Sequence, residues 1–186
     1  MNLPNFITIC RILLVPAVVY LIVTGQPLGA FWLFVVAGVS DAVDGFIARR
    51  FRWQTELGSY LDPLADKALL VSIYVSLGIF GEMPVWLVFL VASRDVFIIV
   101  AVMLSWMLSR PVAMAPLMVS KANTASQILL AAVVLADLGF GLQMQAFRQG
   151  LVLLVAGLTV LSAAAYLVEW LRHMGVGDGP AAPGKP

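Results

Sequence analysis

Residues 41–66 read DAVDGFIARRFRWQTELGSYLDPLAD and join two long apolar stretches of the chain. Five of the ten acidic residues fall within them: Asp41, Asp44, Glu56, Asp62 and Asp66. Asp41 and Asp44 are three positions apart, and Asp62 and Asp66 are four apart, so on helices each pair projects from one face. The short connection between the pairs predicts two antiparallel neighbouring helices whose aspartates converge at similar depth.

The composition around this stretch indicates a membrane protein. The chain has 186 residues, of which 62% are hydrophobic and 11% charged, and its mean hydropathy is +1.00. An average soluble domain carries roughly 25% charged residues, so an ordinary cytosolic enzyme is excluded. The net charge of +1 gives no sign of nucleic-acid binding. Because Cys10 and His173 are single, any bound metal must use oxygen ligands, which favours a hard cation.

The distribution of apolar residues predicts the fold. Six stretches are long enough to cross a bilayer, which takes roughly 20 residues each, and breakers rich in Gly, Pro and charged residues separate them. We expect an all-α bundle of six transmembrane helices at 6–24, 28–50, 58–80, 84–108, 121–140 and 147–171. Residues 1–174 would form this single membrane domain, and the Gly-, Pro- and Ala-rich segment 175–186 a disordered tail.

Basic residues predict the orientation of the bundle. Most basic residues lie in or beside the second and fourth connections, or after the last helix. They are Arg49, Arg50, Arg52, Arg110, Arg172 and Lys185. The clear basic residue on the opposite side is Arg148. The positive-inside rule therefore places both termini and the even-numbered connections in the cytoplasm. No signal peptide or targeting extension is evident, so we expect a multi-pass protein of a bacterial inner membrane.

Four aspartates at membrane depth need compensation. Each charged side chain near the bilayer centre costs roughly 3 kcal/mol, and mutual repulsion adds to this. Two divalent cations would balance four carboxylates. The small residues Gly45, Ala48 and Gly58 leave room for a ligand, or for a second helix, close to the backbone. The alternative interpretation is that the aspartates are interfacial and face water or pair with nearby arginines.

The spacing D-x2-D-G-x2-A-R-x8-G-x3-D-x3-D is fully present within 41–66. It resembles the signature of the CDP-alcohol phosphotransferase family, and the resemblance extends over residues 2–171. The resemblance implies a six-helix membrane enzyme, commonly a homodimer, with its active site on the cytoplasmic side. Such enzymes use two divalent cations, Mg²⁺ or Mn²⁺, to transfer a substituted phosphoryl group from a CDP-linked donor to an alcohol, with release of CMP.

The same resemblance implies roles for individual residues. Asp41, Asp44 and Asp62 would hold the metal ions, and Asp66 would complete the second metal site and act as the catalytic base. Residues expected to bind the CDP donor are Asn5, Thr8, Gly45, Ala48, Arg49, Thr55 and Gly58. Asn5 has an alternative role as a helix N-cap. The chemistry agrees, because two metal ions roughly 4 Å apart can clamp a diphosphate and a guanidinium suits phosphate oxygens.

Polar residues also interrupt the later apolar stretches. They are Lys67, Arg94-Asp95, Gln127 and the run Lys121-Ala122-Asn123-Thr124. The functional hypothesis is that the acceptor alcohol is bound by Arg94, Lys121, Asn123 and Thr124. The alternatives are neighbouring-charge pairs for Arg94, Asp95 and Lys67, and an interfacial, snorkelling role for Lys121.

The run SKANT at 120–124 helps to choose the acceptor. It resembles Ser-Lys-x-Asn-Thr of CMP-forming cardiolipin synthases, whereas phosphatidylglycerophosphate synthases typically carry a second lysine where this chain has Asn123. One lysine suits the monoanionic phosphodiester of phosphatidylglycerol, and two suit the near-dianion glycerol 3-phosphate. We therefore expect transfer of a phosphatidyl group from CDP-diacylglycerol to phosphatidylglycerol, giving cardiolipin and CMP, with glycerol 3-phosphate as the alternative acceptor.

Two further classes of protein share some of these features. Intramembrane carboxylates also mark ion pathways, as in a cation- or proton-coupled transporter. A transporter would not need the Gly, Ala and Arg positions at their observed spacing around the aspartates. A non-catalytic scaffold would be favoured by the loss of a signature aspartate, and all four are present.

Overall fold

The computed structural model of the chain describes the backbone of residues 3–51, 56–107 and 118–175 and the side chains of 13–41, 43, 66–101, 103–104 and 118–171. Apart from short turns, these ranges form six α-helices and contain no strand. The helices are α1 (Leu3–Val23), α2 (Pro27–Phe51), α3 (Glu56–Ile79), α4 (Val85–Met107), α5 (Met118–Phe140) and α6 (Gln145–Gly175).

The six helices agree with the prediction from hydropathy, but several of their ends differ. The helix α3 begins at Glu56 rather than 58, α5 begins at Met118 rather than 121, and α6 continues to Gly175 rather than ending at 171. Backbone hydrogen bonding continues past the end of an apolar stretch, so hydropathy alone does not locate a helix terminus. The connection at 52–55 and the tail predicted beyond residue 175 lie outside the described residues.

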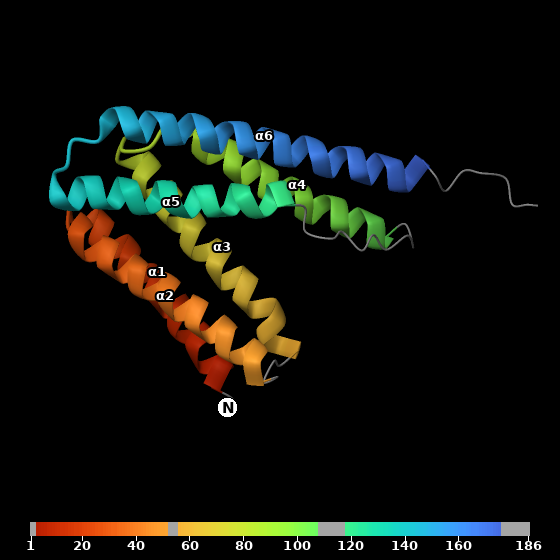
Figure 1. The fold of residues 1–186 in the computed structure, drawn as a ribbon, viewed down its shortest axis with the longest axis horizontal. Coiled ribbons are helices and arrows are strands. Elements are labelled where there is room, and N and C mark those ends of the chain that lie inside the picture. The colour runs from red at the N-terminus through yellow and green to blue at the C-terminus, as the bar shows by residue number, and fades with distance from the viewer. Residues whose placement is uncertain (1–2, 52–55, 108–117, 176–186) are drawn as a thin grey trace, which may run out of the picture.

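Three turns of similar design gather at one end of the molecule (Figure 1). The helices α1, α3 and α5 are each followed by a glycine with positive φ: Gly25 (70°), Gly81 (76°) and Gly141 (66°). The next residue in each turn donates a backbone hydrogen bond to a carbonyl five positions earlier, as in Gln26 to Leu21 (2.8 Å). This is the Schellman ending, which satisfies the last carbonyls of a helix and favours glycine. Each turn reverses the chain, so successive helices run antiparallel.

The helices form two groups that meet at an oblique angle (Figure 1). In the first group α1 packs against both α2 and α3, and in the second α6 packs against both α4 and α5. Contacts of α5 with α2, and of α3 with α4 and α5, join the groups. The backbones of α2 and α5 approach closely at Gly139, where an added Cβ would lie 2.8 Å from the Cα of Leu28. A side chain at this position would therefore push the two helices apart.

The exterior of the bundle is apolar, while several polar side chains are buried inside it. Large hydrophobic side chains are exposed on all six helices, and the buried polar residues include Arg94, Asn123 and Thr159. This distribution suits a protein surrounded by lipid. Within the described residues, Met118–Phe140 and Gln145–Leu171 have the length and hydropathy of membrane spans, and Leu13–Val23 and Pro27–Asp41 are shorter apolar segments. Six spans with cytoplasmic termini stay a prediction.

Candidate active site

A cavity of about 430 Å³ lies among α2, α3, α4 and α5. Each of the four helices contributes one or two polar residues to its wall at the end remote from the three glycine turns. These residues are Asp41 on α2, Asp66 and Lys67 on α3, Asp95 on α4 and Thr124 on α5. Carboxylates outnumber ammonium groups on this wall by three to one.

The rest of the cavity is mainly apolar and extends toward the glycine turns. Two helical turns away from the polar end, toward the glycine turns, the cavity is lined by Phe34 on α2, Tyr74 on α3, Val88 on α4 and Ala132 on α5. With a rise of 1.5 Å per residue, they lie about 10–12 Å along the helix axes from the polar end. The cavity is therefore amphiphilic, with a polar end and an apolar body.

Two of the signature aspartates line this cavity, one from α2 and one from α3. Asp41 and Asp66 line it from α2 and α3, and both of these helices pack against α1. Asp44 and Asp62 also lie within the helical backbones of α2 and α3, but their side chains are outside the described part of the chain. Two of the four predicted metal ligands thus line one cavity. The prediction that their helices are direct neighbours is wrong for the described residues, because α2 and α3 do not contact each other there and α1 packs against both.

The donor set of this wall fits a hard divalent cation. Among the described side chains there is no group of three or more Asp, Glu, His or Cys that could hold a metal ion. The two described signature residues on the wall, Asp41 and Asp66, nevertheless offer carboxylate oxygens, which Mg²⁺ and Mn²⁺ accept. The excess of carboxylates would also repel an anionic diphosphate unless cations intervened. The residues present are therefore compatible with metal binding.

All seven of the predicted donor-binding residues have side chains outside the described part of the chain. They are Asn5, Thr8, Gly45, Ala48, Arg49, Thr55 and Gly58. The backbone does test one alternative, because α1 begins at Leu3 and places Asn5 in its first turn rather than at its N-cap. Pro4 is compatible with this start, since proline is well suited to the first turn of a helix.

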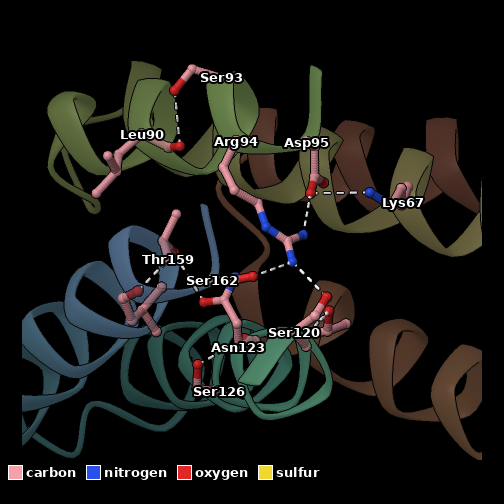
Figure 2. Close-up of polar contacts among 12 residues, drawn as sticks. Lys67, Leu90, Ser93, Arg94, Asp95, Ser120, Asn123, Ser126, Thr159 and Ser162 are labelled. Atoms are coloured by element: carbon pink, nitrogen blue, oxygen red, sulfur yellow. Dashed lines mark hydrogen bonds and ion pairs between the residues drawn. The ribbon is translucent and has the colours of Figure 1, made fainter. Parts of the chain in front are cut away.

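Lys67, Asp95 and Arg94 form a continuous ionic chain beside the cavity (Figure 2). The Nζ atom of Lys67 lies 3.0 Å from Oδ1 of Asp95, and Nη1 of Arg94 lies 2.7 Å from the same oxygen. Lys67 is 45% exposed, whereas Arg94 is only 5% exposed. The neighbouring-charge pairing considered from the sequence is therefore present, and it links α3 to α4.

The Arg94 guanidinium also joins α4 to the last two helices. Its Nη2 donates hydrogen bonds to Oγ of Ser120 (2.6 Å) and to Oγ of Ser162 (2.7 Å), so it reaches both α5 and α6 (Figure 2). Its Cζ lies 5.8 Å from the ring centroid of Tyr166, a distance at which a cation is attracted to an aromatic face. Arg94 is thus held within the protein and does not line the cavity.

The other predicted acceptor residues occupy three different environments. Asn123 is fully buried, and its Oδ1 accepts a hydrogen bond from Oγ1 of Thr159 (2.9 Å). Lys121 is exposed at the start of α5. Thr124 lines the cavity and donates to the carbonyl of Ser120 (3.2 Å). Of the four predicted acceptor residues, only Thr124 therefore reaches the cavity wall.

Two polar residues of the cavity carry no role in the sequence-based prediction. Tyr74 and Gln127 line the cavity and are almost completely buried. The Tyr74 hydroxyl donates to the backbone carbonyl of Gln127 (3.1 Å) and so joins α3 to α5. Gln127 lies one helical turn after Thr124, and this spacing is the only signal in the sequence that could have identified it.

Comparison with known proteins places this geometry in context. A family model described as CDP-alcohol phosphatidyltransferase matches residues 1–168. The human "Cardiolipin synthase (CMP-forming)" is 37% identical over 181 residues, covering 89% of this chain and 60% of the human protein. The chain thus spans about 60% of the length of that relative. The "CDP-diacylglycerol--glycerol-3-phosphate 3-phosphatidyltransferase" of Escherichia coli (strain K12) is 33% identical over 176 residues, covering 91% of this chain and 90% of the bacterial protein.

The family model covers both groups of helices, including the signature and the cavity wall. The Escherichia coli relative matches over nearly its whole length, so the likeness extends well beyond one motif. The chain belongs to the CDP-alcohol phosphatidyltransferase family.

Proposed function

We propose that the protein transfers a phosphatidyl group from CDP-diacylglycerol to phosphatidylglycerol, giving cardiolipin and CMP. Family membership supports CMP-forming phosphatidyl transfer as the reaction class. The observation that carries the proposal is the position of Asp41 and Asp66 on the wall of one amphiphilic cavity. Its polar end suits the reacting phosphates, and its apolar body suits a lipid substrate.

In the proposed reaction, Asp66 accepts the proton of the glycerol headgroup hydroxyl of phosphatidylglycerol. The hydroxyl oxygen forms a new bond to the phosphorus that bears diacylglycerol, while the bond from this phosphorus to the bridging diphosphate oxygen breaks. CMP leaves with that electron pair. General-base catalysis of this kind requires Asp66 to come within hydrogen-bond reach of the hydroxyl in the complex.

The carboxylates of the signature would hold two divalent cations, with Asp41, Asp44, Asp62 and Asp66 as the ligands. Bound cations would neutralise the diphosphate and stabilise the charge on the departing CMP. The side chain of Lys67 supplies positive charge on the same wall. An ammonium has three N–H donors, so Lys67 can bind a phosphate oxygen while it retains Asp95, at 3.0 Å.

Arg94 and Asn123 would act on the acceptor indirectly. Both are buried in the contact between α5 and its neighbours, through Ser120, Ser162 and Thr159. Holding α5 in this register fixes Thr124 on the cavity wall and Lys121 at the exposed start of the helix. Thr124 and Lys121 would then contact the acceptor headgroup directly.

The proposed setting is a bacterial inner membrane, with the polar end of the cavity toward the cytoplasm. Arg148 lies at the opposite end, close to the glycine turns, where it pairs with Asp137 and Glu82. Arg49 and Arg50 near the end of α2 and Arg172 near the end of α6 belong to helix ends remote from the glycine turns, which supports this orientation by the positive-inside rule. A homodimer is proposed on the family resemblance.

A second candidate function is the same transfer to glycerol 3-phosphate. It is favoured by the likeness to the Escherichia coli enzyme whose name states that acceptor. The two candidates share the donor, the metal site and the role of Asp66, and they differ only in the alcohol.

The deciding experiment incubates the purified protein with CDP-diacylglycerol and either phosphatidylglycerol or glycerol 3-phosphate, with Mg²⁺ or Mn²⁺ present. We expect cardiolipin and CMP with phosphatidylglycerol, and no lipid product with glycerol 3-phosphate, as identified by mass spectrometry. Phosphatidylglycerophosphate as the sole product would establish the second candidate. Absence of CMP with both acceptors would contradict the proposed function.

A further inference from the structure

The ionic chain of Lys67, Asp95 and Arg94 runs from the cavity into the interior of the protein (Figure 2). Lys67 and Asp95 both line the cavity, whereas Arg94 does not. The exposed fraction of the side chains falls from 45% at Lys67 to 15% at Asp95 and 5% at Arg94. One carboxylate oxygen, Oδ1 of Asp95, contacts both cations, at 3.0 and 2.7 Å. Asp95 therefore connects a buried guanidinium to an ammonium group at the cavity wall.

The buried end of this chain is fixed by several contacts. The Arg94 guanidinium donates hydrogen bonds to Oδ1 of Asp95 and to the hydroxyls of Ser120 (2.6 Å) and Ser162 (2.7 Å). These partners come from α4, α5 and α6, and the planar guanidinium holds its acceptors in a fixed geometry. Arg94 therefore keeps the Asp95 carboxylate in one position on the cavity wall.

The other end of the chain depends on Asp95 for its position. Lysine has a flexible four-carbon stem, so an ammonium without a partner would sample several positions. The partner of the Lys67 ammonium is Asp95 on the next helix. An ion pair with a half-exposed lysine adds little to stability. The main consequence of this contact is therefore to keep the ammonium beside the cavity, on the same turn of α3 as the wall residue Asp66.

Arg94 also determines how much of the Lys67 charge remains available. A carboxylate beside a lysine normally weakens the attraction of that lysine for an anion. Here the charge of Asp95 is already offset by Arg94, which lies 2.7 Å away and is buried. The three side chains together carry one net positive charge, and its most exposed carrier is Lys67. Lys67 can therefore be held by Asp95 and still attract a diphosphate.

We propose that Asp95 is a positioning residue, which holds the Lys67 ammonium at the polar end of the cavity to bind a phosphate oxygen of the CDP-linked donor. Arg94 is the buried counter-charge that leaves the Lys67 charge available. The inference rests on the proposed function and adds a residue outside the signature to the donor site. Asp95 acts through Lys67, whereas Asp41 and Asp66 are proposed to act on the cations and on the reacting hydroxyl.

The test is a double-mutant cycle of Asp95→Asn and Lys67→Met. Asp95→Asn keeps the size of the side chain and an oxygen that can accept from Arg94, but it removes the charge that holds the ammonium. The donor KM and kcat are measured from CMP release in mixed micelles, at fixed phosphatidylglycerol and Mg²⁺. We expect Asp95→Asn to raise the donor KM roughly fivefold, the usual effect of ordering one long side chain at a binding site, and to change KM more than kcat. In the Lys67→Met background the same change should not raise KM further, because no ammonium remains to be positioned.

Three results would overturn the proposal. A folded Asp95→Asn with the wild-type donor KM would leave Asp95 with a structural role alone. An equal rise in KM in both backgrounds would show that Asp95 acts without Lys67. A changed dependence of the rate on Mg²⁺ concentration would show that Asp95 binds a cation. The matched control is Glu169→Gln, which removes one negative charge from the exposed face of α6 and should keep the wild-type KM.

A second measurement uses the wild-type protein, so it does not depend on the folding of a variant. The rate at which trace acetic anhydride acetylates the Lys67 amine is read by mass spectrometry, with and without CDP-diacylglycerol and with no acceptor. We expect bound donor to slow the acetylation of Lys67 relative to that of Lys121, which is exposed at the start of α5. An unchanged rate at Lys67 would overturn the proposal. Failure of the proposed function is separate, because it appears as absence of CMP release by the wild type.

Discussion

The buried guanidinium of Arg94 offers the most direct test of how the second group of helices, α4, α5 and α6, is held together. Arg94→Met removes the contact with Asp95 (2.7 Å) and the hydrogen bonds to Ser120 (2.6 Å) and Ser162 (2.7 Å), while it keeps a long side chain in place. It therefore separates the loss of charge and hydrogen bonding from the loss of volume.

The expected size of the effect follows from these contacts. Removing one partner of a buried ion pair costs about 3–5 kcal/mol, and a hydrogen bond between membrane helices contributes about 0.6 kcal/mol. Asp95 retains Lys67 at 3.0 Å, so its charge is not left alone. We therefore expect Arg94→Met to lower the free energy of unfolding by about 3 kcal/mol. Ser162→Ala should lower it by only about 0.6 kcal/mol.

Both variants can be measured by reversible unfolding with increasing fractions of SDS in mixed micelles, followed by far-UV circular dichroism. The ratio between the two losses matters more than either value. Equal stability of Arg94→Met and the wild type would refute the assignment of Arg94 as the residue that joins α4 to α5 and α6. A loss for Ser162→Ala as large as that for Arg94→Met would refute the view that the ion pair dominates.

Three further predictions concern the packing of α2 against α5, the ion pairs of Arg148 near the glycine turns, and Lys67 on the cavity wall. Gly139→Ala should lower the free energy of unfolding by about 1–3 kcal/mol because its Cβ would meet the backbone of α2. Gly157→Ala should not lower the free energy of unfolding, because an added Cβ there would meet no atom within 4 Å outside its own stretch of helix. Equal losses of stability for the two variants in thermal unfolding would contradict this packing. Arg148→Met removes contacts with Asp137 (3.0 Å) and Glu82 (3.2 Å). It should lower the free energy of unfolding by about 2 kcal/mol, as expected for a hydrogen bond to a charged group, and leave the donor KM unchanged. A changed donor KM in an Arg148→Met variant of wild-type stability would contradict a purely structural role for Arg148. Lys67→Met should raise the donor KM about tenfold, the effect expected for one charge-assisted hydrogen bond. The KM is measured from steady-state CMP release, and an unchanged KM would contradict a contact between Lys67 and a phosphate.

The sequence predicted the helices well because their signals are local. Apolar stretches of membrane length and glycines such as Gly25 and Gly81 locate the helices and the turns without any tertiary information. The ends were less predictable, since α5 begins at Met118, three residues before the polar Lys121, and α6 continues past Arg172 to Gly175, and hydropathy does not mark where backbone hydrogen bonding ends.

The site was predictable only in part, for a physical reason. Asp41 and Asp66 could be assigned to one site because both belong to a single short signature, which fixes the spacing of its aspartates within each helix. The partners of Arg94 could not, because Ser120 and Ser162 are distant in sequence and depend on the register of three packed helices. The same register buries Asn123 against α6, where the sequence had suggested direct contact with the acceptor.

Gln127 shows a further limit of reasoning from sequence. A single glutamine in an apolar helix is compatible with a cavity, an interhelical contact or a lipid-facing position. The packing of α5 against α2 and α3 decides between these, because it buries Gln127 and places it on the cavity wall.

The central claim is that the signature carboxylates on the cavity wall perform CMP-forming phosphatidyl transfer. The most direct measurement is the rate of CMP release from CDP-diacylglycerol by purified Asp66→Asn, with Glu169→Gln on the exposed face of α6 as the control. Both variants should keep the wild-type helical content by circular dichroism. We predict that Asp66→Asn releases no CMP above background while Glu169→Gln matches the wild type. A folded Asp66→Asn that releases CMP at the wild-type rate would contradict the account.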